Sequence, residues 1–87
     1  MAWRVKLRPS VIKELNKLPK AAQERVLTFL ESLPANPRSK GKAMKVGKNE
    51  PPMWRYRTGD YGIVCYLRDE DKTALILRVG HRKDVYR

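Results

Sequence analysis

Four stretches of this chain predict strands, either because apolar and polar residues alternate or because a short apolar run occupies both faces. The first stretch covers residues 2–7, and the others cover residues 53–57, 61–68 and 73–79. Short turns at 58–60 and 69–72 separate the last three, which predicts a meander of antiparallel strands. The final strand is apolar on both faces and ends at Gly80, so we expect it to lie in the interior of a sheet.

A helical spacing occupies the chain between the first and second strands. Residues 10–18 carry one apolar stripe, which Pro19 ends, and residues 20–33 carry another. Pro9 and Ser10 can share the N1 and N-cap roles of the first helix in more than one way. We therefore predict an α+β fold: an N-terminal strand, a helical hairpin and a three-stranded antiparallel meander, with the helices packed on one face of the sheet.

The chain is strongly basic. Its 87 residues contain 20 Lys and Arg against 9 Asp and Glu, which gives a formal net charge of +11. Such a charge on a small body favours a polyanionic partner, namely RNA, DNA, an anionic membrane surface or an acidic protein. The alternative is a solvated basic surface without a ligand. At this length we expect one domain over residues 1–87, with a simple core and no deep closed cavity.

Residue types that hold metals or cofactors are scarce. Cys65 is the one cysteine, so an intrachain disulfide is excluded and a small core residue is expected. His81 is the one histidine, and the sequence contains no glycine-rich phosphate-binding motif, so we expect neither a metal nor a cofactor. The N-terminus lacks a continuous apolar segment and no apolar run is long enough to span a membrane. These features predict a cytosolic protein.

Residues 38–49 contain five cations, no acid and two glycines. One interpretation is a solvated linker, because such a run cannot bury itself. The other is a mobile clamp that neutralises several phosphates, which requires several cations on a flexible backbone. The cations are Arg38, Lys40, Lys42, Lys45 and Lys48.

Two arginines mark the sheet face that the helices leave uncovered. Arg55 and Arg57 lie two residues apart on a predicted strand and therefore share a face. A solvated strand face is the ordinary interpretation, but like charges side by side cost stability unless an anion lies between them. Arg82 and Lys83 follow the last strand and lie within reach of the same surface. Together these cations suit a phosphate-bearing ligand.

Nucleophilic catalysis by a side chain of the protein is disfavoured, because Ser10 and Ser32 have no base near them in the sequence. His81 is either a surface or stacking residue or a group for proton transfer near neutral pH. A reaction whose nucleophile belongs to the substrate remains compatible, such as attack of an RNA 2′-hydroxyl on its own phosphate. That reaction needs proton transfers and cations that stabilise the phosphorane.

Three motifs make the chain resemble a known family. They are residues 54–61 (Trp-Arg-Tyr-Arg-Thr-Gly-Asp-Tyr), 63–66 (Ile-Val-Cys-Tyr) and 78–86 (Arg-Val-Gly-His-Arg-Lys-Asp-Val-Tyr). Together with the helical segment at 14–19 and the loop at 36–44, they resemble the RelE branch of the RelE/ParE toxin family of toxin–antitoxin modules. The resemblance covers essentially the whole chain, and its C-terminal motifs are the specific part.

The resemblance implies a ribosome-dependent endoribonuclease that cuts mRNA in the decoding site without a metal, and an acidic antitoxin that binds and covers it. By position, it implies that Arg55 and Arg57 bind phosphate or take up a proton, and that Arg82 stabilises the transition state. It implies that Tyr86 stacks on the cut nucleotide, with His81 at a neighbouring position. Guanidinium groups stay protonated in proteins, so we assign the first two arginines an electrostatic role. The expected RNA-binding cations are Arg38, Lys40, Lys42, Lys45, Lys48 and Lys83.

Gly62 departs from the family pattern. After the Asp60-Tyr61 pair the family usually has an arginine that contacts the scissile phosphate, and glycine offers no charge. Either Arg57 or a lysine of the 38–48 loop replaces that contact, or this copy is an attenuated toxin.

Two other functions remain open at this stage. A ParE-like inhibitor of DNA gyrase shares the fold and charge but cuts no RNA, and a non-catalytic RNA- or ribosome-binding module needs only the basic surface. The pair Arg82 and Tyr86 favours the nuclease, because a gyrase inhibitor does not need it.

Overall fold

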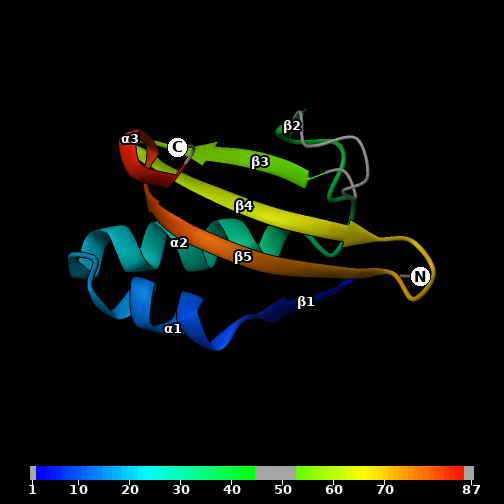
Figure 1. Ribbon diagram of the computed structural model, residues 1–87, viewed down its shortest axis with the longest axis horizontal. Coiled ribbons are helices and arrows are strands. Elements are labelled where there is room, and N and C mark those ends of the chain that lie inside the picture. Colours follow the sequence, from blue (N-terminus) through cyan, green and yellow to red (C-terminus); the bar gives the residue numbers. More distant parts are fainter. Residues whose placement is uncertain (1, 45–52, 86–87) are drawn as a thin grey trace.

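The computed structural model describes residues 2–44 and 53–85, which form one five-stranded sheet and three helices (Figure 1). In chain order, the elements are β1 (Arg4–Leu7), α1 (Pro9–Asn16), α2 (Lys20–Ser32), β2 (Lys42–Met44), β3 (Met53–Thr58), β4 (Tyr61–Arg68), β5 (Thr73–His81) and α3 (Arg82–Val85). The predicted α+β fold is confirmed, with two elements, β2 and α3, that the sequence patterns did not indicate.

The sheet has the strand order β1-β5-β4-β3-β2. The predicted antiparallel meander is its centre, formed by β3, β4 and β5. β1 lies parallel to β5, and β2 lies antiparallel to β3, so these two short strands form the edges. β5 has neighbours on both sides, as its two apolar faces predicted.

Proline residues set the limits of the helical hairpin. Pro9 stands in the first turn of α1, where its missing N–H costs nothing, and Arg8 rather than Ser10 is the N-cap residue. α1 ends at Asn16, and Pro19 is the N-cap residue of α2. Both helices lie on the same side of the sheet (Figure 1).

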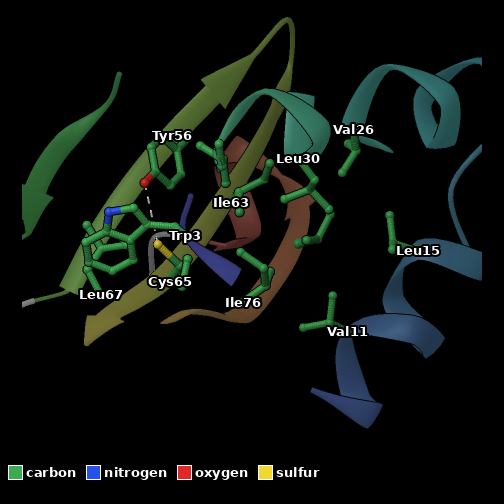
Figure 2. Close-up of a cluster of buried hydrophobic side chains, with 13 residues drawn as sticks. Trp3, Val11, Leu15, Val26, Leu30, Tyr56, Ile63, Cys65, Leu67 and Ile76 are labelled. Carbon is green, nitrogen blue, oxygen red and sulfur yellow. Dashed lines mark hydrogen bonds between the residues drawn. The ribbon is translucent and has the colours of Figure 1, made fainter. Parts of the chain in front are cut away.

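The core fills the space between that helix pair and one face of the sheet (Figure 2). α1 contributes Val11 and Leu15, and α2 contributes Val26 and Leu30. The sheet contributes alternate residues of its strands, except in β5, where an irregularity in the pairing with β4 places Ile76 and Val79 three positions apart on the core face. They are Tyr56, Ile63, Cys65, Leu67, Ala74, Ile76 and Val79.

The C-terminal prediction was wrong in two respects. Gly80 does not end the last strand, because β5 continues to His81 through pairing with Tyr61. The residues after it are not a simple charged tail, because Arg82–Val85 form the short helix α3. Four residues are too few to show an amphipathic period in the sequence. In Figure 1, α3 lies at the end of β5, on the side of the sheet away from α1 and α2.

Residues 38–49, interpreted as either a solvated linker or a mobile clamp, include the edge strand β2 at Lys42–Met44, which neither interpretation predicted. Lys45 and Lys48 lie outside the described residues, as does Tyr86. In the described part of the chain, no helix is long and apolar enough to cross a membrane.

Candidate functional site

The face of the sheet opposite the helices carries cations in register. Tyr56 and Ile63 belong to the core, so the residues that alternate with them point to the uncovered face, which we call the open face. Lys42 pairs with Arg55 across β2 and β3, and Arg57 pairs with Gly62 across β3 and β4. The prediction that Arg55 and Arg57 share the face away from the helices is therefore confirmed.

These cations surround an open pocket of about 250 Å³, which we call the basic pocket. It is lined by Gly41, Lys42, Arg55 and Arg57. Three cations from two adjacent strands converge there, and strands are only about 5 Å apart. Such an arrangement suits a phosphate group or another compact anion, because an anion between the side chains offsets their mutual repulsion.

The loop before β2 places Lys42 in the basic pocket. The indole N–H of Trp54 donates a hydrogen bond of 2.7 Å to the carbonyl of Lys40, and the hydroxyl of Tyr56 donates one of 2.6 Å to the carbonyl of Pro37. Gly41 has a positive φ of 74°, and a Cβ there would collide with the carbonyl oxygen of Arg55. Backbone contact thus fixes the loop against β3.

Cys65 and Tyr56 form the buried support under the basic pocket. The thiol of Cys65 lies 3.7 Å from the hydroxyl of Tyr56, and both residues have no exposed surface (Figure 2). Burial raises the pKa of Cys65 to about 11, and burial also raises the pKa of Tyr56. The thiol therefore stays protonated near neutral pH, in agreement with the predicted core role.

Two of the five predicted RNA-binding loop cations lie away from the open face. Arg38 makes a bidentate ion pair with Asp69 at 2.9 and 2.8 Å and lies over the ring of Trp3. Lys40 donates to the hydroxyl of Ser32 on α2. Lys42 alone of the described loop cations lines the basic pocket.

α3 covers the open face next to Arg57. Gly62 pairs with Gly80, and a Cβ on Gly80 would lie 2.9 Å from a methyl group of Val85, whose side chain is 3% exposed. The backbone N–H of Arg82 donates a hydrogen bond of 2.9 Å to the carbonyl of Asp60 in the β3–β4 turn. The helix α3, which begins with Arg82, thus packs against the open face at Gly80.

Arg82 and Lys83 are exposed on α3, at the same end of the sheet as Arg57. Arg57, Gly62 and Gly80 are successive cross-strand neighbours, so two strand spacings of about 5 Å separate Arg57 from the strand that precedes α3. The structure thus brings Arg55, Arg57 and α3 to one end of the open face.

His81 lies on the other side of the sheet. It pairs with Tyr61, which packs against the core, and the two rings meet edge-on with centroids 6.0 Å apart. A second cavity of about 380 Å³ is lined by both, by Glu14 of α1 and by Asp84 and Val85 of α3. The Nδ1 atom of His81 accepts a hydrogen bond from the backbone N–H of Lys83. His81 thus lines another cavity than Arg55 and Arg57, whereas Arg82 follows it directly as the first residue of α3.

Comparison with known proteins places this arrangement in a class. The family described as "ParE toxin of type II toxin-antitoxin system, parDE" matches residues 5–86. Toxin RelG of Mycobacterium tuberculosis is 31% identical over 88 residues, which cover 100% of this chain and 99% of that protein.

Solved structures agree with these sequence matches. The toxin-antitoxin complex RelBE2 of M. tuberculosis contains a chain with a TM-score of 0.83 and 28% identity, covering 94% of this chain and 100% of that one. The archaeal RelE-RelB complex of Pyrococcus horikoshii gives a TM-score of 0.76 and 34% identity, covering 98% and 100%.

The protein is thus a toxin of a type II toxin–antitoxin system. Within that class, the chain belongs to the RelE/ParE family. The predicted resemblance is confirmed at the level of the family and the fold.

Proposed function

We propose that this toxin is an mRNA endoribonuclease of the RelE type, which inhibits translation by cutting mRNA in the decoding site of the ribosome. The observation that carries the proposal is the basic pocket beside α3. There Lys42, Arg55 and Arg57 face the side of the sheet that the helices leave open. RelE toxins are ribonucleases, and the identities of 31% and 34% with proteins named RelG and RelE support the same activity here.

In the proposed reaction the ribose 2′-oxygen attacks the adjacent phosphorus, and the bond from phosphorus to the 5′-oxygen breaks. A 2′,3′-cyclic phosphate and a 5′-hydroxyl form, and the proton that leaves the 2′-hydroxyl is balanced by one that the 5′-oxygen takes up. The phosphorane carries more negative charge than the ground state, so fixed cations stabilise it preferentially. We assign this role to Arg55, Arg57 and Lys42.

Arg82 is the proposed second source of transition-state stabilisation, and Tyr86, outside the described residues, is the proposed stacking residue. Arg82 is exposed at the start of α3, and its backbone is held by Asp60. Lys83 follows it as a phosphate-binding cation. His81 receives no catalytic role in this proposal, because it lines another cavity than the basic pocket.

Gly62 lies on the open face between Arg57 and Gly80, at the centre of the proposed site. A side chain that contacts the scissile phosphate is missing from this position, and we propose that this copy is an attenuated enzyme for that reason. Arg57, one strand away, is the residue that takes over part of the contact.

An acidic antitoxin is the proposed protein partner. The two related structures are toxin–antitoxin complexes, and the net charge of +11 favours an acidic partner. The proposed site of action is cytoplasmic, where ribosomes translate mRNA.

The experiment is single-turnover cleavage of ribosome-bound mRNA by purified toxin. We expect Arg82→Ala to slow cleavage by more than about tenfold, as loss of one transition-state contact does, with an unchanged circular dichroism spectrum. Lys13→Ala is a matched control, because Lys13 is an exposed cation on α1 behind the sheet. Undiminished cleavage by Arg82→Ala removes Arg82 from the mechanism.

A ParE-like inhibitor of DNA gyrase is the second candidate. The match of residues 5–86 to the family described as ParE toxins favours it. This function requires no cleavage chemistry, so it predicts intact mRNA and loss of gyrase-dependent supercoiling in the same cells.

A further inference from the structure

The open face has an aromatic and apolar centre in addition to its cations. Met53, Tyr66 and Leu75 are direct cross-strand neighbours on β3, β4 and β5, and all three are half-buried. Their chain neighbours Cys65 and Ala74 belong to the core, so these side chains point to the open face. We call Met53, Val64, Tyr66 and Leu75 the Tyr66 platform.

Tyr66 is the aromatic residue of this face in the described part of the chain. The other described aromatic side chains of the sheet, Trp54, Tyr56 and Tyr61, pack with the core. A ring in a sheet has its edges fixed by cross-strand neighbours, and it loses little conformational entropy when a ligand covers it.

Cations flank the platform on two sides. Arg55 is paired with Val64, two residues from Tyr66 and therefore about 7 Å along the strand. On the far side, β1 places Lys6 beside Leu75 and the exposed Arg4 one row further. Arg68 also belongs to that row, where it forms an ion pair with Asp71 at 2.7 Å. The basic pocket and the β1 cations thus lie at opposite margins of the platform.

No strand in the described part of the chain contains an acidic residue, because the described acids lie in turns and helices. The face therefore combines one aromatic ring, apolar neighbours and positive charge. Proteins that bind single-stranded RNA combine the same elements, since bases stack on aromatic rings while phosphates track cations. An acidic protein would also meet the cations, but attraction to an acidic surface needs no aromatic ring.

We propose that the Tyr66 platform binds one unpaired nucleobase of an RNA strand whose phosphates cross the basic pocket. Tyr66 stacks on the base, Met53 and Leu75 contact its edges, and Arg55 and Lys6 lie at the margins of the platform near the adjoining phosphates. This inference rests on the proposed function in one respect, namely that the bound RNA is the substrate. It adds a base-binding subsite about two rows of the sheet away from Gly62.

The test measures binding without cleavage. The probe is a fluorescent single-stranded RNA of about ten nucleotides, 2′-O-methylated throughout so that no 2′-hydroxyl can attack. Fluorescence anisotropy at several salt concentrations gives the Kd. We expect Tyr66→Leu, which keeps apolar bulk, to weaken binding by about tenfold, whereas Tyr66→Phe stays within about twofold of wild type.

The salt dependence separates stacking from charge. Tyr66→Leu is expected to leave the slope of log Kd against log salt unchanged, because no cation is lost. Arg57→Gln is the matched control, and it is expected to reduce the magnitude of that slope by about 0.7 for a single strand. Thermal unfolding followed by circular dichroism checks that the three variants are folded.

Equal affinity of Tyr66→Leu and wild type overturns the proposal, and so does absence of salt-dependent binding by the wild type. If RNA affinity is equal but Tyr66→Leu weakens binding of the antitoxin, the platform is a protein interface. The probe cannot be cut, so it measures binding separately from cleavage. Tight binding that depends on Tyr66, together with failure to cleave natural mRNA, would support the Tyr66 platform and refute only the proposed nuclease activity.

Discussion

Replacing Gly80 by alanine is expected to loosen α3 without unfolding the sheet. Gly80 lies within β5, and its φ is not in the left-handed region. The cost of a side chain there is therefore steric rather than conformational. The new Cβ would lie 2.9 Å from a methyl carbon of Val85, whereas carbon atoms pack best at about 3.5–4.0 Å.

Overpacking of this kind costs about 1–3 kcal/mol. This steric cost weakens the contact between α3 and the sheet, because α3 has four residues and is held by Val85 and by the N–H of Arg82. The equilibrium between docked and undocked α3 should shift by about 5- to 150-fold. Arg82 is then no longer held at the end of the open face, and we expect slower RNA cleavage.

Amide hydrogen exchange at Arg82 measures the docking directly, because this N–H is bonded to Asp60 in the docked helix. Exchange should accelerate in Gly80→Ala, while amides in the middle of β4 keep their protection. In the double variant with Val85→Ala, the new methyl group fills space that the valine vacated, so the combined effect should be smaller than the sum of the single effects. Unchanged exchange in Gly80→Ala, or strict additivity, would refute the reasoning.

Three other predictions concern the core and the proposed site. The contribution of Cys65 to the free energy of unfolding should be constant below about pH 8.5 and decrease by about 2–3 kcal/mol as the pH rises through 9–11, because burial raises the pKa of Cys65 to about 11 and the folded state retains the proton longer; urea titrations should show a weaker decrease for Cys65→Ala. Tyr56→Phe should lower stability by about 1–3 kcal/mol, since the carbonyl of Pro37 loses its buried donor; an unchanged urea midpoint would contradict this. Induced Gly62→Arg should arrest growth more strongly than the wild type, and equal, strong arrest by both would dispose of the attenuation hypothesis.

Strand alternation and helix stripes carry most of the information about this fold. β3 shows a period of two, whereas β4 and β5 are apolar runs between turn residues. The helix stripes include Val11, Leu15, Val26 and Leu30, which are buried in the core, and also Ile12, which is half exposed. β2 escaped prediction because a three-residue edge strand is too short to show a period. Its register depends on Gly41 and on hydrogen bonds from β3, which are contacts distant in the sequence.

The candidate site was predictable where it depended on alternation and not where it depended on register. Arg55 and Arg57 could be assigned to the open face because the alternation within a single strand determines which face a side chain occupies. Lys42 was one of five equivalent cations until β2 paired it with Arg55. His81 ends β5 and lines another cavity than Arg55 and Arg57, whereas its sequence neighbour Arg82 begins α3, and the sequence showed no boundary between the two residues. In the sequence, Gly62 was noticeable only because a charged residue was expected there. Its pairing with Gly80 became visible only in the structure of the sheet.

The most direct test of the central claim is primer extension on mRNA from cells in which this toxin is induced, with plasmid supercoiling measured in parallel. The account predicts cleavage inside translated reading frames, normal supercoiling, and loss of cleavage in the Arg82→Ala variant. Intact mRNA together with loss of supercoiling would contradict the account and establish the gyrase-directed function in its place.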